Sequence, residues 1–411
     1  GPELAGPSLP AAGRGISSFG WSADGRTVLV SRPDDGYDLF DAATGQHVRG
    51  LPGKADVRPW FGPGSWQTSR LCPMLVSPPE LYAPPINPGG HRAGDSQVHT
   101  WDRRLLAARG AHDEPLGRGV DARTAESPPS APTVVSVYEA WTGRWLYRLE
   151  PPIHGDMAFS QDGRRLLTID RNGFRVWDSV TGKELLHRPL PARGRLPTGT
   201  GAGAGIAWAP DGRRVAIGDR DGTILIWDVA VPRPKRMPLS PANLDQLWTD
   251  LGSDDPHVGW KAVNALADRP GESVEFLLDR VTPVKPLDAK TVQPLIADLD
   301  SPSYRTRERA TRAALEAGDA IRPAIDAALK AGPGPESRKR LEDLQARLAN
   351  GHPPTTNDLR RLRAIAVLEA AGSEEARGRI EELALGMPGA RVTMEAKLTA
   401  ERLATRDQSG R

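Results

Sequence analysis

The chain has 411 residues, of which 38% are hydrophobic and 26% are charged, so it is long enough for two or three domains with sizeable cores. Its 54 basic and 52 acidic residues leave a formal charge of +2, which argues against a surface that binds nucleic acid by overall charge. The single cysteine, Cys72, excludes an internal disulfide and multi-cysteine metal sites, and no apolar run reaches the roughly 18 residues of a membrane helix.

The first predicted element is a group of short strands at 19–48, with the sequence FGWSADGRTVLVSRPDDGYDLFDAATGQHV. Short apolar stretches alternate there with Asp-Gly turns, which is the pattern of β-hairpins. One strand closes in Phe40-Asp41, and a Thr-Gly turn then leads into another strand. Because an isolated hairpin is unstable in water, this unit needs neighbours of its own kind.

The stretch 51–133 breaks this pattern, because it is rich in Pro, Gly and Arg and alternates weakly. We expect an irregular insertion, with loop or disorder as the default interpretation. A functional insertion and a misread coding frame are the alternatives. Within it, VHTWD, which ends at Asp102, is a partial copy of the repeat. Directly after it, VVSVYEAWTGRWLYRL at 134–149 is a second partial copy.

Two further full copies lie at 159–186 and 208–228, and their turn aspartates, Asp162 and Asp211, are 49 residues apart. The distance from the first turn Asp to the closing Asp is nearly constant, at 17, 16 and 17 residues for 24 to 41, 162 to 178 and 211 to 228. Four strands per unit with a period of roughly 40 to 50 residues are typical of propeller blades.

The order of Asp-Gly turn, strand, second turn and strand closing in Trp-Asp resembles the WD-repeat family. The resemblance implies that the Trp packs between blades, that the Asp ties strand ends together, and that a His stands near the start of a blade. The residues expected in these structural positions are Trp177, Asp178, Trp227, Asp228, Phe40, Asp41 and His154. We therefore expect a partial or small WD-repeat β-propeller of about four to five blades, some degenerate, over 1–230. A twisted antiparallel sandwich is the alternative.

The last copy lacks an outer strand, because Asp228 is followed by a proline-rich stretch. Residues 1–14 align without gaps with 182–195, which follow the closing Asp of the preceding copy. Propellers of the resembled family close by lending an N-terminal strand to the last blade, so residues 3–8 are predicted to pair antiparallel with the strand Thr223 to Trp227. Truncation inside a longer propeller is the rival explanation.

After a linker at 231–239, the pattern becomes helical over 240–404, and 405–411 is expected to be a disordered tail. Ser240-Pro241 has the form of a helix cap followed by a first-turn proline. Leu244, Leu247, Trp248 and Leu251 then recur at helical spacing. Complementary apolar faces and a linker with three prolines predict that the helical part folds alone.

Three helical pairs follow the same sequence pattern, and Ala262, Ala310 and Ala364 occupy the corresponding position in them. This pattern resembles HEAT-type repeats and predicts an all-α HEAT-like helical domain, so the whole chain is a multidomain β + α protein. The order of sheets and helices resembles the large WD-repeat proteins of planctomycete-type bacteria. In that group, such blades can follow a protein kinase or a sigma-factor-like module.

No catalytic constellation, cofactor site or metal site is predicted. The glycine run at 199–205 lacks the phosphate-binding spacing, and the turn at 219–222 lacks the ligands of a calcium loop. The eight histidines form no metal-ligand pair. Basic residues near 305–312, 338–340 and 360–363 are interleaved with acidic ones, which favours a self-paired surface over a nucleic-acid site.

The sequence therefore predicts a non-catalytic protein–protein interaction scaffold with one or more protein partners, no membrane contact and a cytoplasmic location. The alternative is the C-terminal regulatory or sensing part of a larger signalling protein with an N-terminal kinase or sigma-factor-like module. An enzymatic propeller is a third class, which would need polar residues converging on a central channel.

Overall fold

A computed structural model describes most of the repeats and helices of the chain. The described residues are 8–10, 19–22, 25–31, 37–51, 97–100, 102, 104–110, 134–150, 156–170, 173–189, 206–218, 223–230, 240–349 and 353–409. His154 lies outside these ranges, as does the linker at 231–239.

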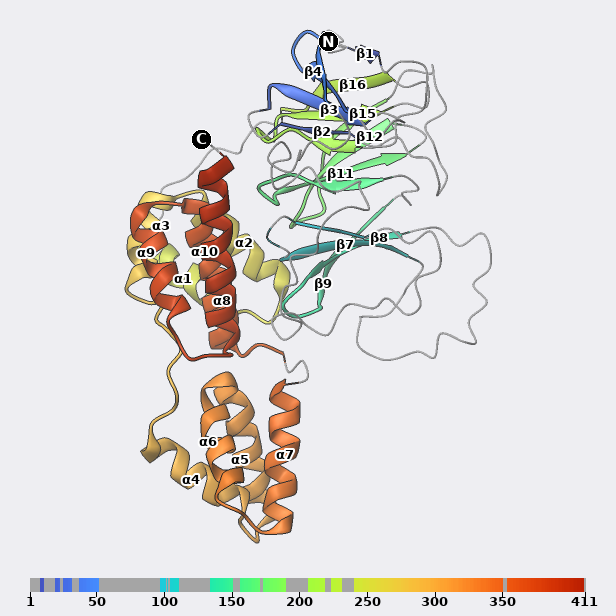
Figure 1. Ribbon diagram of the computed structural model, residues 1–411. Helices are drawn as coiled ribbons and strands as arrows, with labels where there is room; N and C mark the ends of the chain where they lie inside the picture. The colour runs from blue at the N-terminus through green and yellow to red at the C-terminus, as the bar shows by residue number, and fades with distance from the viewer. Residues whose placement is uncertain are drawn as a thin grey trace, which may run out of the picture.

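The sheet-forming part contains four antiparallel sheets of four strands each, which we number as blades in chain order (Figure 1). Blade 1 consists of β2 (Phe19–Trp21), β3 (Thr27–Ser31), β4 (Tyr37–Asp41) and β5 (His47–Leu51). Blade 2 consists of β6 (Gln97–His99), β7 (Leu105–Gly110), β8 (Val134–Glu139) and β9 (Trp145–Leu149).

Blade 3 consists of β10 (Met157–Phe159), β11 (Arg165–Asp170), β12 (Gly173–Asp178) and β13 (Glu184–Arg188). Blade 4 consists of β14 (Ile206–Trp208), β15 (Arg214–Gly218), β16 (Thr223–Asp228) and the N-terminal strand β1 (Ser8–Pro10). The described residues thus give four blades, at the lower end of the four to five expected, and no sandwich.

The N-terminal strand completes the last blade, as the sequence predicted. β1 pairs antiparallel with β16, with Ser8 opposite Leu225 and Pro10 opposite Thr223. The pairing residues are 8–10 rather than the expected 3–8, of which 3–7 lie outside the described residues. No hairpin turn joins β1 to β16, so local sequence does not determine their register.

The expected insertion at 51–133 is wrong in part, because 97–99 and 105–110 form the first two strands of blade 2. The two partial copies of the repeat are therefore one blade. The partial copy that ends at Asp102 suggested a closing Asp there, but Asp102 lies in the first turn, where its Oδ1 accepts from the Thr100 hydroxyl at 2.6 Å and the Arg104 amide at 3.1 Å. Asp102 thus occupies the place of Asp162 in blade 3, and not that of the closing Asp178.

The blades stack through their first strands in the order blade 1, blade 4, blade 3, blade 2. Trp21 Nε1 in β2 donates to the carbonyl of Ala207 in β14 at 3.3 Å, and Trp208 Nε1 in β14 donates to the carbonyl of Ala158 in β10 at 3.0 Å. Figure 1 places blades 1 and 2 at opposite ends of this stack. The described strands therefore form an arc of blades.

Apolar side chains fill the spaces between successive blades. One buried cluster joins blades 1 and 4 around Trp21 and Ile226, and another joins blades 4 and 3 around Trp208 and Phe174. A third cluster begins between blades 3 and 2 and continues without a break into the helices. Blades 2 and 3 and the helices nearest to them therefore share one apolar core.

The helical part begins where the sequence predicted, because the Ser240 hydroxyl accepts from the Asn243 amide at 3.2 Å and Pro241 opens α1. The helices are α1 (Pro241–Leu251), α2 (Pro256–Ala267), α3 (Pro270–Leu278), α4 (Ala289–Leu299), α5 (Tyr304–Ala317), the 3₁₀ turn η3 (Gly318–Ile321), α6 (Arg322–Lys330), α7 (Pro335–Ala349), α8 (Thr356–Ala371), α9 (Glu374–Ala384) and α10 (Arg391–Ser409). Helix α10 continues past the predicted boundary at 404, because neither Gly nor Pro interrupts it before Gly410.

The helices form two groups (Figure 1). Helices α1, α2, α3, α9 and α10 pack around α8 beside the sheets, and α4–α7 form a separate group with its own apolar core. Ala262, Ala310 and Ala364 are all buried, as the repeat pattern predicted. Consecutive helices pack as pairs, but α8 also packs on α1, α2 and α3, so the order departs from a linear stack in which each repeat contacts only its neighbours.

In the part of the chain that the structure describes, none of the helices combines the length and the apolar character needed to span a bilayer.

Candidate functional site

Each blade carries an arginine at the same place in its first turn. The backbone carbonyls of these arginines accept from a residue after the third strand, in the pairs Arg26 with Ala42, Arg104 with Ala140, Arg164 with Ser179 and Arg213 with Val229. We call the edge of the arc formed by these four turns the arginine rim. The same backbone geometry presents each side chain at the same edge of its blade.

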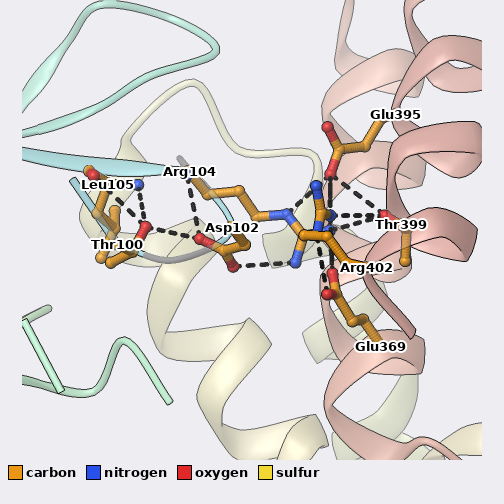
Figure 2. A network of polar contacts seen from close by, with 8 residues as sticks. All are labelled: Thr100, Asp102, Arg104, Leu105, Glu369, Glu395, Thr399 and Arg402. Atoms are coloured by element: carbon orange, nitrogen blue, oxygen red, sulfur yellow. Dashed lines mark hydrogen bonds and ion pairs between the residues drawn. The ribbon is translucent and has the colours of Figure 1, made fainter. Parts of the chain in front are cut away.

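In blade 2, the rim arginine is buried against the helices (Figure 2). The Arg104 side chain is 2% exposed, and its Nη2 lies 2.7 Å from Glu369 Oε2 in α8 and 2.7 Å from Glu395 Oε1 in α10. Its Nη1 lies 3.1 Å from Asp102 Oδ2, and Nη2 also donates to the Thr399 hydroxyl at 3.2 Å. One blade residue thus joins two helices.

A second arginine balances the charge of this network. Arg402 Nη2 in α10 lies 2.8 Å from Glu369 Oε2 and 3.0 Å from Glu395 Oε1. Burial alone lowers the pKa of Arg104, but the carboxylates of Glu369, Glu395 and Asp102 outweigh burial and raise that pKa above its usual value. The pKa of Arg402 is raised in the same way against its own burial. Both guanidinium groups therefore stay charged, as a buried network requires.

A second buried ion pair lies at the end of the third strand of blade 2. Arg363 in α8 binds Glu139 with both groups fully buried, through Nε to Oε1 at 3.0 Å and Nη2 to Oε2 at 3.0 Å. Arg363 Nη1 also donates to the carbonyls of Leu251 and Ser253. All of its guanidinium nitrogens are thus used in holding α8, the end of α1 and the blade together.

The other blades have Asp where blade 2 has Glu139. Asp41 and Asp178 accept from the backbone amides two and three residues later, and from the hydroxyl of the Thr three residues later. Glu139 still accepts from the Thr142 hydroxyl at 2.7 Å. Its longer side chain also reaches Arg363, so a single methylene converts a turn cap into a contact between the sheets and the helices.

The turn after Glu139 adds an aromatic contact. Trp141 stacks on Trp260 of α2, with ring centroids 6.0 Å apart and planes inclined by 13°. Arg104 Cζ lies 5.6 Å from the centroid of the Trp141 ring. Blades 1, 3 and 4 have Ala43, Val180 and Ala230 at this position, so only blade 2 presents a large ring to the helices.

Helix α2 leaves room for the buried pair at Gly259. A Cβ atom added there would lie 2.2 Å from Arg363 Cζ. The Arg363 side chain is fully buried, and protein interiors are close-packed, so the guanidinium group has little room to move aside. A glycine is therefore required where α2 crosses α8.

Blade 3 contacts the helices less extensively. Its rim arginine, Arg164, pairs with Asp268 at the end of α2, and both side chains are about one-third exposed. Arg144, in the turn between β8 and β9 of blade 2, binds the backbone carbonyl of Asp254 before α2. The helices thus cover the arginine rim at blades 2 and 3.

At blades 4 and 1, the equivalent arginines, Arg213 and Arg26, are exposed. The two turns are adjacent, because Arg214 Nη2 in blade 4 donates to the carbonyl of Gly25 in blade 1 at 2.8 Å. Half of the arginine rim is therefore covered by the chain's own helices and half faces outward.

The residues predicted to hold the blades lie at equivalent places. Asp41 and Asp178 cap their turns as described, and Asp228 Oδ1 accepts from the Ala230 amide at 2.8 Å. Trp177 is buried between blades 2 and 3, and its Nε1 donates to the Thr168 hydroxyl at 2.8 Å. Phe40 is buried between blades 1 and 4.

Trp227 differs from this expectation, because it is only partly buried beside the core of blades 3 and 4. It packs on Phe174 with ring centroids 5.4 Å apart. In blade 3 the outer strand extends far enough to pair with Trp177, whereas β1 pairs with β16 only as far as Leu225. The described part of blade 4 thus leaves Trp227 beyond the end of its outer strand.

A hollow of about 510 Å³ lies between the two helical groups. Its lining includes Lys285, Glu316, Asp358 and Arg361 together with apolar residues. Burial, with a smaller contribution from Asp319, raises the pKa of Asp358. Asp358 accepts from the Thr355 hydroxyl at 2.9 Å, which makes it part of a helix cap. No cluster of metal-ligand type occurs among the described residues.

Several basic residues of the helices form ion pairs with acidic residues of the helices. Arg309 pairs with Asp298, and Arg340 pairs with Glu336. Arg363 does not belong to a surface ridge, because it is fully buried. This arrangement agrees with the self-paired surface favoured by the sequence.

The residues that join sheets and helices, above all Arg104, Glu139, Trp141 and Arg363, were not predicted as a site. Two sequence signals pointed to them: Glu replaces the repeat's Asp at 139, and Trp replaces a small residue at 141. Both departures occur in the same blade, which is the blade that the helices contact.

Comparison with protein families matches residues 202–228 to the WD domain, G-beta repeat. This segment contains β14, β15 and β16 of blade 4. No curated protein matches the chain significantly. The chain therefore contains a WD repeat within a set of four similar sheets, followed by helices, and a WD repeat supports a role in protein interaction.

Proposed function

We propose that this protein is a non-catalytic scaffold that binds other proteins through its blades. The observation that carries the proposal is the arginine rim, where one repeated turn already serves as a docking surface for helices in blades 2 and 3. Repeat architectures offer several equivalent surfaces, so a chain that uses some of them internally retains others for partners.

The described residues favour binding over catalysis. The buried charges of the junction are paired with one another, and they fix the position of the helices on the blades. Such networks add specificity of arrangement more than stability. We propose a cytoplasmic location, which accords with a single cysteine.

We also propose the division into sheets at 1–230, a linker at 231–239 and helices from 240 to the end of α10 at Ser409. The sequence predicted that the helical part folds alone, but the apolar cluster shared by blades 2 and 3 with α1–α3 and α8–α10 favours unfolding of the two parts together. Limited proteolysis within 231–239 tests this point. We expect the cleaved halves to remain associated, whereas separate halves would support independent domains.

Affinity capture with the full chain, from a lysate of the source organism treated with nuclease, tests the scaffold proposal. We expect at least one protein to be recovered in a stoichiometric amount. Recovery of nucleic acid alone, or loss of every protein after nuclease treatment, would contradict the proposal. The alternative, a regulatory part of a larger signalling protein, requires a kinase or sigma-factor-like module before the blades. Sequencing the gene upstream tests for such a module.

A further inference from the structure

We propose that the arginine rim at blades 4 and 1 binds a helix of a partner protein, and that carboxylates on this helix pair with Arg213 and Arg26. This inference rests on the proposed scaffold function and specifies its surface and the chemistry of its partner.

The precedent lies within the molecule itself. The rim arginines of blades 2 and 3 bind carboxylates of helices: Arg104 binds Glu369 and Glu395, and Arg164 binds Asp268. Arg213 and Arg26 stand on the same backbone geometry, as shown by the hydrogen bonds from Val229 and Ala42 to their carbonyls. A helix with suitably placed acidic residues would meet the same arrangement of groups.

The two exposed arginines belong to one continuous surface. Arg214 links the turns of blades 4 and 1 through its bond to Gly25, and its Cζ lies 5.0 Å from the centroid of the Trp21 ring. Arg213 and Arg26 are the chain neighbours of these two linked residues. The turns that carry Arg213 and Arg26 are therefore in direct contact, and we expect a helix that lies across both turns to pass the two arginines.

Three described aspartates near this surface are already engaged in their own turns. Asp228 accepts from the Ala230 amide, and Asp211 pairs with Arg214 at 3.1 Å. Hydrogen bonds from the Thr44 hydroxyl and amide, and from the Ala43 amide, lower the pKa of Asp41. Arg26 keeps an interaction within the chain, but Arg104 likewise keeps Asp102 while binding two helix carboxylates.

The neighbouring turn positions also suit a helix. Blade 2 has Trp141 there, whereas blades 4 and 1 have Ala230 and Ala43, and both of these alanines are exposed. Small side chains let a helix backbone approach closely enough for Glu side chains to reach the arginines. An acidic helix is thus favoured over nucleic acid, because the equivalent arginines of blades 2 and 3 bind carboxylates of helices.

Binding of a fluorescent helical peptide to the full chain tests the inference. The peptide has about 20 residues, which is long enough to populate a helix, and carries Glu pairs at i and i+4 on one face. A matched peptide has Gln at these positions. We expect the Glu peptide to bind more tightly, and the double variant Arg26→Glu/Arg213→Glu to weaken its binding about tenfold.

The control variant is Arg305→Glu/Arg312→Glu, which changes net charge equally at two exposed positions of α5. We expect it to bind the Glu peptide like the original chain. Equal weakening by both variants, equal binding of both peptides, or displacement of the peptide by a single-stranded RNA oligonucleotide would overturn the inference. If affinity capture recovers a protein whose binding ignores the rim variant, the scaffold function stands and this inference fails.

Discussion

Blades 2 and 4 show how one repeated unit acquires two roles. Both place an arginine at the same turn, yet Arg104 is 2% exposed within a network of carboxylates, whereas Arg213 faces outward. The backbone hydrogen bonds around the two residues are equivalent. The difference therefore comes from what packs against the turn.

Blade 2 differs from its neighbours at two further positions, where Glu139 and Trp141 replace Asp and a small residue. Each replacement adds reach or contact area in the direction of the helices. Blade 4 keeps the shorter residues and has no such contact. The comparison teaches that a repeat becomes an interface through a few longer side chains on an unchanged frame.

The largest expected difference in stability arises when the same substitution is made at the two equivalent turns. Arg104→Met should lower the free energy of unfolding by about 3 to 5 kcal/mol, because Glu369 and Glu395 would lose a buried partner. Arg213→Met should change it by no more than about 0.5 kcal/mol, as is usual for surface positions. Urea unfolding of the full chain measures both. Similar losses in the two variants would show that burial does not separate the two turns.

A second prediction concerns the closing tryptophans of blades 3 and 4. Trp177→Ala should cost about 3 to 5 kcal/mol, because the side chain is 4% exposed between two blades. Trp227→Ala should cost about 2 kcal/mol, because its side chain retains access to water. Thermal and urea unfolding would compare them. A larger loss for Trp227→Ala would mean that the end of blade 4 is better covered than the described strands indicate.

A third prediction tests how tightly α2 fits against the buried pair. Gly259→Ala should destabilise the protein by about 1 to 3 kcal/mol, because the new methyl group would overlap the Arg363 guanidinium. The matched control is Gly271→Ala in α3, where a Cβ atom meets nothing within 4 Å. Helix propensity alone should make that variant more stable by about 0.5 to 1 kcal/mol. Opposite signs for the two variants confirm the close fit, and equal signs contradict it.

The smallest effect concerns a buried carboxylate at the start of α8 that lacks a close ion pair. Burial raises the pKa of Asp358 in the folded protein and Asp319 raises it further, against the opposing effects of the hydrogen bond from Thr355 and the charge of Arg361. The folded state therefore holds this proton more tightly than the unfolded state. Its contribution to stability is fully present below the ordinary carboxyl pKa and is lost as pH rises through the folded pKa.

Asp358→Asn removes this titration while keeping an oxygen that can accept from Thr355. We expect the variant to gain stability relative to the original chain as pH rises from 4 towards 7. Unfolding curves at several pH values measure the difference. A gain that appears instead as pH falls would contradict the sign assigned here.

The sequence by itself determined the elements and their repetition. The local signals are the Asp-Gly turns, the aromatic residues that close strands (Phe40, Trp177 and Trp227) and the helix cap at Ser240. Each depends on residues only a few positions apart. The N-terminal strand that completes blade 4 was also predictable, because the sequence after the third strand of that blade offers no outer strand. Its register was not, because no turn connects β1 to β16.

Only the tertiary structure decided which blades contact the helices. Arg363 is 224 residues from Glu139, and Arg104 is 291 residues from Glu395, so no local pattern links these partners. The Arg at the rim looks the same in every blade, and a charge run on α8 looks like a solvated surface. Whether a charged group is buried depends on the elements that surround it, and that arrangement is set by packing over the whole chain.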